Sequence, residues 1–264
     1  MRKVDPALLA WRDAHEAAAP VLAFGALPAA RRFPLRRARF PFISDVVADL
    51  ASRLGRTPRV LDAGLGQAKL ERLHLHAHPE APARWHGVDR HAYRLELRRA
   101  VEGIERAQAD LLALPYADGA FDAAVCSYVL QHLVEPDAAA RELARVVAPG
   151  GLVVLAVPNL PQPLKLLSEL CHPLLVWAKR RRGRRFDYGA QVQFWNLPRL
   201  RRLVLDAGLV PARWQGFGFV TGGPLGWLED REWWYRWNVA LGARIPRLAQ
   251  DLVVVCERPL RSSR

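Results

Sequence analysis

The stretch RVLDAGLGQAKLE, residues 59–71, contains an apolar run, an acid and two glycines separated by one residue. The apolar run ending in Asp62 predicts a buried strand, and the residues after Gly66 predict a helix. Gly64 and Gly66 lie between them, where glycine permits positive φ values and removes the Cβ that would block a close approach. The N–H groups that begin the helix favour a carboxylate or a phosphate. The stretch therefore predicts a strand, turn and helix that bring backbone close to a ligand.

Two classes of ligand use such turns, and the sequence fits each pattern incompletely. A dinucleotide turn needs a third glycine at the position of Lys69, which makes a nicotinamide dehydrogenase the least favoured interpretation. The pattern typical of S-adenosylmethionine binding finds Asp62, Gly64 and Gly66 in place but Ala68 where the last glycine belongs. Because alanine is the smallest substitute for glycine, close packing of the helix on the strand could survive.

Short apolar runs alternate with helical patterns from residue 59 to 158, which is typical of βαβ units and a parallel sheet. The predicted strands are residues 59–64, 84–89, 104–110, 121–130 and 151–159. Between the last two, a helix that ends at the glycine pair Gly150 and Gly151 is predicted by the spacing of Ala139, Leu143, Val146 and Val147. Further along, the sequence predicts a helix over 196–208 and strands near 209–219 and 251–259.

Two more acids recur at the ends of predicted strands. Asp89 closes the second strand, where its carboxylate could accept both hydroxyl hydrogens of a ribose. Asp110 follows the third strand, where an acid could accept a hydrogen bond from the exocyclic amine of adenine. The alternative is that acids such as Asp62 and Asp89 only cap helices at strand ends. That alternative explains each acid singly but not their ordered recurrence.

The run ADLLALPYADGAFDAAVCSYVLQHLVEPDAAARELARVVAPGGLVVLAVPN, residues 109–159, resembles the class I S-adenosylmethionine-dependent methyltransferases of the type 11 group, which includes ubiquinone-biosynthesis-like enzymes. The similarity is close over residues 59–158 and looser over 194–209. It implies an α/β fold with a doubly wound, mostly parallel seven-stranded sheet. It also implies S-adenosylmethionine as the cofactor.

We expect one methyltransferase domain over residues 1–264, divided into four parts. These are a helical N-terminal cap at 1–58, a cofactor-binding core at 59–158, a basic and apolar lid insertion after the fifth strand at 159–195, and the C-terminal part of the sheet with an aromatic-rich insert at 196–264.

The resemblance also implies roles for individual residues. Asp62, Gly64 and Gly66 would wrap the methionine part of the cofactor, and Asp89 would hold the ribose. Asp110 and Leu111 would frame the adenine, and Ser127 would lie near the sulfonium, with Gln131 and His132 just beyond it. His132 is the candidate general base because an unperturbed imidazole titrates near neutral pH. The alternative for His132 is a histidine hydrogen-bonded to backbone.

The net charge of +13 would attract nucleic acid, anionic lipid or acidic substrates. Nearly all the basic residues are Arg, so a compositional bias of the genome could explain the charge equally well. One basic run follows an apolar helical pattern and could lie on an anionic membrane surface, grip RNA phosphates, or remain a solvated charge run. It consists of Lys179, Arg180, Arg181, Arg182, Arg184 and Arg185.

The aromatic-rich stretch 217–237 could line a pocket for an apolar acceptor. The helical spacing of Trp233, Trp234 and Trp237 also fits a packed core. We therefore expect a small-molecule acceptor, apolar or lipid-linked. The alternatives are a module that binds S-adenosylmethionine but has lost catalysis, and an RNA-binding or RNA-modifying methyltransferase, which the sequence does not favour.

Composition limits the compartment and the metal chemistry. Acids at positions 5, 13 and 16 interrupt any signal-peptide core. The longest apolar runs fall well short of the roughly 20 residues that span a bilayer. Cys126, Cys171 and Cys256 are far apart and form no Cys-x-x-Cys pair, so neither a disulfide framework nor a metal site is expected. The expected compartment is the cytoplasm.

Overall fold

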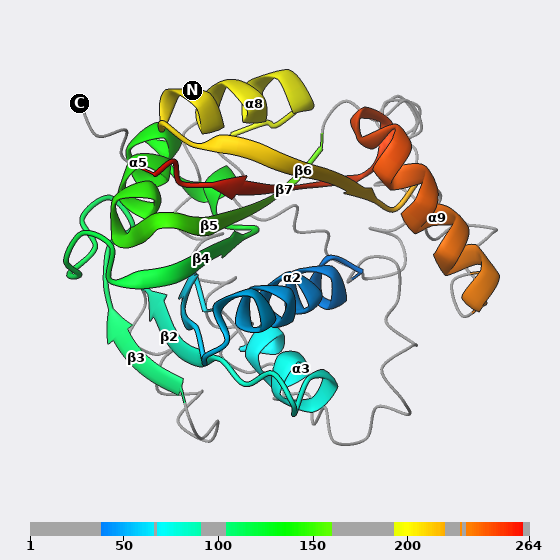
Figure 1. The fold of residues 1–264 in the computed structure, drawn as a ribbon. Coiled ribbons are helices and arrows are strands. Elements are labelled where there is room, and N and C mark those ends of the chain that lie inside the picture. The colour runs from blue at the N-terminus through cyan, green and yellow to red at the C-terminus, as the bar shows by residue number, and fades with distance from the viewer. Residues whose placement is uncertain are drawn as a thin grey trace, which may run out of the picture.

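The computed structural model describes residues 38–65, 68–90, 104–159, 193–219, 228 and 231–260. The described residues form a seven-stranded sheet in the order β3-β2-β1-β4-β5-β7-β6, with helices on both faces (Figure 1). The strands are β1 Arg59–Ala63, β2 Arg84–Asp89, β3 Ile104–Gln108, β4 Phe121–Ser127, β5 Val147–Pro158, β6 Val210–Phe217 and β7 Asp251–Glu257. The predicted α/β, mostly parallel seven-stranded sheet is confirmed.

Five α-helices and two 3-10 helices accompany the strands in the described part of the chain. The α-helices are α2 Arg39–Leu54, α3 Lys69–Ala77, α5 Pro136–Val146, α8 Leu197–Asp206 and α9 Glu232–Arg244, and the 3-10 helices are η3 Leu130–His132 and η5 Pro246–Leu248. Helix α2 lies within the predicted N-terminal cap. No described helix combines the length and the apolar character that a membrane span requires.

The centre of the sheet is a topological switch point. β1 pairs in parallel with both β2 and β4, although the chain runs outward through β2 and β3 before it returns to β4. β7 runs antiparallel to its neighbours β5 and β6. In open α/β sheets, ligands bind outside the carboxyl ends of the strands at such a point. The ends of β1 and β4 are therefore the first place to look for a site.

Two cores cover the two faces of the sheet. On one face, Leu61 belongs to a cluster with residues of α5 and α8. On the other face, Val60 belongs to a cluster with residues of α2 and α3, and residues of α9 pack against the same cluster. Successive side chains of a strand point to opposite faces. Asp62, two residues after Val60, therefore lies on the face that α2 and α3 cover (Figure 1).

Two predicted strand boundaries were wrong by more than two residues. The fourth strand ends at Ser127 rather than residue 130, because Tyr128 takes a left-handed conformation with φ 62°. The fifth strand begins at Val147 rather than Gly151, and the preceding helix ends at Val146. Val147 pairs with Phe121 of β4, so the strand starts before the glycine pair.

The turn after β1 is held by backbone hydrogen bonds. The N–H groups of Gly64 and Leu65 donate to the carbonyl of Val88 at 2.8 and 2.9 Å. Gly64 has φ 100°, and a Cβ built on it would lie 2.2 Å from Cγ2 of Val129. Ala68, which precedes α3, has φ 47° and ψ 39° and is fully buried. The left-handed conformation that the missing glycine would favour is therefore present, at a cost of roughly 1–2 kcal/mol for an L-residue.

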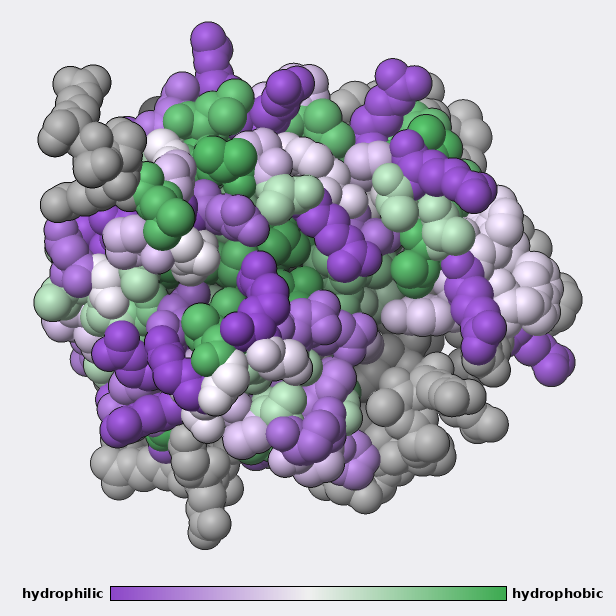
Figure 2. Space-filling model, viewed as in Figure 1, coloured by the Kyte–Doolittle hydropathy of each residue, from purple (hydrophilic) through white to green (hydrophobic). Residues whose placement is uncertain are grey.

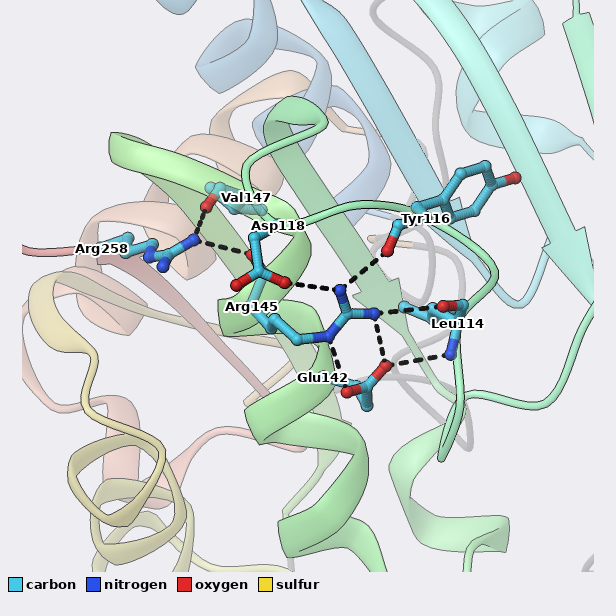
Figure 3. A network of polar contacts seen from close by, with 7 residues as sticks. All are labelled: Leu114, Tyr116, Asp118, Glu142, Arg145, Val147 and Arg258. Atoms are coloured by element: carbon cyan, nitrogen blue, oxygen red, sulfur yellow. Dashed lines mark hydrogen bonds and ion pairs between the residues drawn. The ribbon is translucent and has the colours of Figure 1, made fainter.

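Arg145 on α5 fixes the loop that follows β3 (Figure 3). Its Nε and one terminal nitrogen donate to the two carboxylate oxygens of Glu142 at 2.9 Å each, and its other terminal nitrogen donates to Asp118 at 2.8 Å. It also donates to the carbonyls of Tyr116 and Leu114 at 2.8 and 3.1 Å. Both carboxylates raise the pKa of Arg145. One guanidinium thus holds a loop that lacks regular structure.

The end of α5 is also tied to the end of the sheet. The guanidinium of Arg258, just beyond β7, donates to the carbonyls of Arg145 and Val147 (Figure 3). The backbone N–H of Gly119 donates to the carbonyl of Arg145 at 2.9 Å. Helix α5 is therefore joined both to the loop at 110–119 and to the C-terminal strand.

We expect Arg145→Met to lower the free energy of unfolding by about 2–3 kcal/mol, because it leaves a carboxylate pair and two carbonyls without their charged donor. Arg141→Met on the same helix is the matched control, because Arg141 is exposed, and it should change stability by less than about 0.5 kcal/mol. Urea unfolding followed by circular dichroism measures both. Equal midpoints for the two variants would show that the network does not hold the fold.

Gly64→Ala should destabilise the protein by more than about 2 kcal/mol, because it adds a clash with Val129 to the cost of a left-handed L-residue. Gly55→Ala is the matched control: Gly55 has φ 61°, yet a Cβ there meets nothing within 4 Å, so only the conformational cost of about 1 kcal/mol applies. Thermal unfolding compares the two. The contact with Val129 is refuted if both variants lose the same stability.

Candidate cofactor site

Asp62 and Asp89 lie at the carboxyl ends of neighbouring strands. Asp62 is aligned with Gly87 of β2, two residues before Asp89, so the two acids lie on the same face of the sheet. Both are almost fully buried, with 6% and 5% of their surface exposed. The structure brings these two predicted site residues together beside the turn at Gly64. The second predicted glycine of the turn, Gly66, lies outside the described residues.

Glu71 on α3 is a further acid at this place, which the sequence reasoning missed. It is fully buried, and its carboxyl lies within hydrogen-bonding reach of Asp62. Burial raises the pKa of Glu71 well above its usual range and that of Asp62 to about 6, and Asp89 contributes to the shift of Asp62. The sequence signal that could have identified Glu71 is its position as an acid beside Leu70 and Leu73 on the buried face of a predicted helix.

Asp110 and Leu111 follow β3 in a turn. Leu111 is buried, whereas Asp110 is exposed. One carboxylate oxygen of Asp110 accepts a hydrogen bond from the N–H of Leu112 at 3.0 Å. Leu111 can therefore supply an apolar surface, and Asp110 has a local role in its own turn as well as an exposed carboxylate.

Ser127, at the end of β4, belongs to a polar cluster that the sequence did not reveal. Its hydroxyl accepts a hydrogen bond from Nε of Arg39 at 3.2 Å. The guanidinium of Arg39 lies 3.9 Å from the ring centroid of Tyr128 and 3.6 Å from the carboxylate of Asp251. The hydroxyl of Tyr128 donates to Asp251, and burial raises its pKa well above the usual range, so the phenol stays neutral. These residues come from α2, from the end of β4 and the residue after it, and from β7, and no local pattern links them.

His132 ends η3, just beyond this cluster. Its side chain is exposed, and its backbone N–H donates to the carbonyl of Val129 at 2.9 Å. Its Nε2 lies 3.3 Å from Nε2 of Gln131, which also donates to the carbonyl of Tyr128 at 2.8 Å. The imidazole is therefore near the end of β4 and accessible to water, as proton exchange requires.

Two predictions concern residues farther from the strand ends. The helical spacing of Trp233, Trp234 and Trp237 is confirmed by α9, but the alternative that they fill a core is wrong for Trp233 and Trp237, which are 59% and 46% exposed. The helix instead turns Asn238 inward, where its side chain accepts a hydrogen bond from the N–H of Phe219 at 3.0 Å.

The predicted basic run 179–185 and most of the lid lie outside the described residues.

The described side chains form no candidate metal centre, and the face drawn in Figure 2 has no single hydrophilic patch. Within the described ranges, no group of three or more His, Cys, Asp or Glu residues could hold a metal ion. Figure 2 shows hydrophilic side chains spread over several elements of this face rather than gathered over one helix.

Comparison with known proteins identifies the central segment. Residues 61–155 match a family model described as a methyltransferase domain. A demethylmenaquinone methyltransferase of Desulfitobacterium hafniense is 30% identical over 137 residues, which cover 49% of this chain and 53% of that protein. A ubiquinone/menaquinone biosynthesis C-methyltransferase of Roseobacter denitrificans is 38% identical over 88 residues, or 28% of this chain and 35% of that protein. The matched regions thus span about half or less of these relatives.

Solved structures show the same fold at low sequence identity. An S-adenosylmethionine-dependent methyltransferase from Mesorhizobium loti has a TM-score of 0.56 at 16% identity, covering 84% of this chain and 98% of that one. The 1,6-didemethyltoxoflavin-N1-methyltransferase of Burkholderia thailandensis has a TM-score of 0.54 at 15% identity, covering 98% and 93%. The segment matched by the family model, residues 61–155, runs from β1 to β5 and is a methyltransferase domain of the type 11 group, which uses S-adenosylmethionine as its cofactor, and the fold of the chain is that of the class I methyltransferases.

Proposed function

We propose that this chain transfers the methyl group of S-adenosylmethionine to a small, apolar acceptor with a hydroxylated ring, of the quinol type. The observation that carries the proposal is the placement of buried Asp62 and Asp89 at the switch point of the sheet. The type of acceptor rests on relatives that are named demethylmenaquinone and ubiquinone/menaquinone methyltransferases.

The residues at the switch point fit this cofactor. Its ammonium and sulfonium are cations, and the site presents a carboxyl of Glu71 whose oxygens have no hydrogen-bond partner in the described part of the chain. We assign Asp62, Gly64 and Gly66 to the methionine part and Asp89 to the ribose. Leu111 would pack against the adenine, with Asp110 at the rim. When bound, S-adenosylmethionine supplies a methyl group already activated by its positive sulfur.

The chain's own contribution would be orientation and proton removal. Holding the acceptor in line is worth up to about 7–11 kcal/mol in favourable cases. Ser127 ends β4 next to the guanidinium of Arg39, which would favour an acceptor that carries a partial negative charge on oxygen. We assign His132 as the general base, because it is exposed to water just beyond Ser127.

The cofactor assignment predicts that Asp89→Ala weakens binding of S-adenosylhomocysteine at least tenfold, because a charge-assisted hydrogen bond is worth roughly 1.5–3 kcal/mol. Isothermal calorimetry measures the affinity without an acceptor. Asp137→Ala, which removes an exposed acid in the first turn of α5, is the control and should bind as the wild type does. Equal affinity of the Asp89 and Asp137 variants would refute the ribose contact.

The acceptor assignment predicts methyl transfer from S-adenosylmethionine to a reduced short-chain demethylmenaquinone and none to total RNA. His132→Ala should lower kcat by about 100-fold or more while the affinity for S-adenosylhomocysteine stays the same. A radiolabelled methyl group extracted with the quinol or retained with the RNA separates the two acceptors. Transfer to RNA alone would overturn the proposed acceptor. Tight cofactor binding without transfer to any acceptor would identify a module that has lost catalysis.

A further inference from the structure

The buried position of Glu71 is not explained by the cofactor contacts assigned above. Its side chain is fully buried on the first turn of α3, and neither carboxyl oxygen has a hydrogen-bond partner among the described residues. Burying an ionised carboxylate without a partner is far more costly than the stability of a domain allows. The group must therefore carry a proton or have a cation close by.

The groups around Glu71 come from three strands. Asp62, at the end of β1, lies within hydrogen-bonding reach, and Asp89, at the end of β2, acts in turn on Asp62. Arg106 of β3 attracts Glu71, although its effect on the carboxyl is smaller than that of Asp62. The register aligns Asp62 with Gly87 and Gly87 with Arg106, so the acid and the guanidinium lie on one face across a residue without a side chain. On β4, burial raises the pKa of the Cys126 thiol, and the charge of Asp62 raises it further. Arg106 thus offsets the charge of Glu71 only in part, because the repulsion from Asp62 is larger.

Two ionised carboxyls in contact can only accept hydrogen bonds, so their oxygens repel each other unless a proton or a cation lies between them. With one proton, the Asp62 and Glu71 pair becomes a donor and an acceptor, and the repulsion becomes a hydrogen bond. Burial raises the pKa of both members, that of Glu71 more strongly. The pair therefore holds one proton near neutral pH.

We propose that Glu71 is a second carboxyl of the methionine subsite, which shares a proton with Asp62 until the ammonium group of the cofactor displaces that proton. This inference rests on the proposed cofactor contacts of Asp62. The ammonium group would bring its charge and its N–H donors to the place where the shared proton had been. Binding would then release a proton to solvent, and the cofactor would bind more tightly as pH rises.

A purely structural role for Glu71 leads to different behaviour. If Glu71 only balances the charge of Arg106, it is ionised with and without the cofactor. Binding would then exchange no proton through this residue. Removing its charge would change the free energy of unfolding and leave the pH dependence of binding unaltered.

The test is calorimetric titration with S-adenosylhomocysteine at pH 7 in two buffers of different ionisation enthalpy, for the wild type and Glu71→Gln. The slope of the binding enthalpy against buffer enthalpy counts the protons released. We expect the wild type to release between half a proton and one, and its affinity to fall up to about tenfold per pH unit between pH 7.5 and 6. Glu71→Gln should release close to none and show a nearly flat affinity over that range.

Glu135→Gln is the matched control, because it makes the same chemical change at an exposed position before α5 and should behave as the wild type does. Equal proton release by the wild type and Glu71→Gln, or none by the wild type, would overturn the inference and leave the cofactor site standing. No binding by the folded wild type would overturn both. If Glu71→Gln does not fold, infrared difference spectra of the wild type decide: the ligand should remove a protonated-carboxyl band, and an unchanged band overturns the inference.

Discussion

The parallel pairing of β1 with β4 is the constraint on which the rest of the site depends. It aligns Asp62 with Val125, so Ser127 projects two residues beyond Asp62 at the same edge of the sheet. The same pairing brings Val129 against Gly64, which leaves no room for a Cβ in the turn. The turn and the end of β4 are therefore one packed unit, although about 60 residues of chain separate them. A cofactor bound at the turn would necessarily lie beside the residues that end β4.

The site concentrates negative charge where burial makes it costly. Asp62, Glu71 and Asp89 are each at least nine-tenths buried, and Arg106 offsets the charge of Glu71 only in part. Structures usually keep such acids apart or pair each with a base, because desolvation opposes ionisation. In a site for a cationic ligand, clustered acids instead stabilise the bound form, because the positive charge of the ligand balances their negative charge.

Local sequence patterns predicted the parts of this structure that local forces determine. Apolar runs and glycines placed β1, β2 and the turn, and an acid at each strand end placed Asp62 and Asp89. The patterns did not predict the contact of Arg39 with Tyr128 and Asp251, because the sheet order alone brings these distant residues together. Helical spacing likewise predicted α9 but not which of its faces packs, so the exposure of Trp233 was missed.

Backbone strain is concentrated at the same edge of the sheet. Ala68 and Tyr128 are the two non-glycine residues with positive φ in the described part of the chain, and they follow β1 and β4 respectively. Each costs roughly 1–2 kcal/mol, so each must be held by its surroundings. The backbone N–H of Tyr128 donates to the carbonyl of Ala156 at 2.8 Å, and its ring lies against Arg39. Two such residues on either side of the switch point are consistent with the cofactor site proposed there, because strained backbone often lies at functional sites.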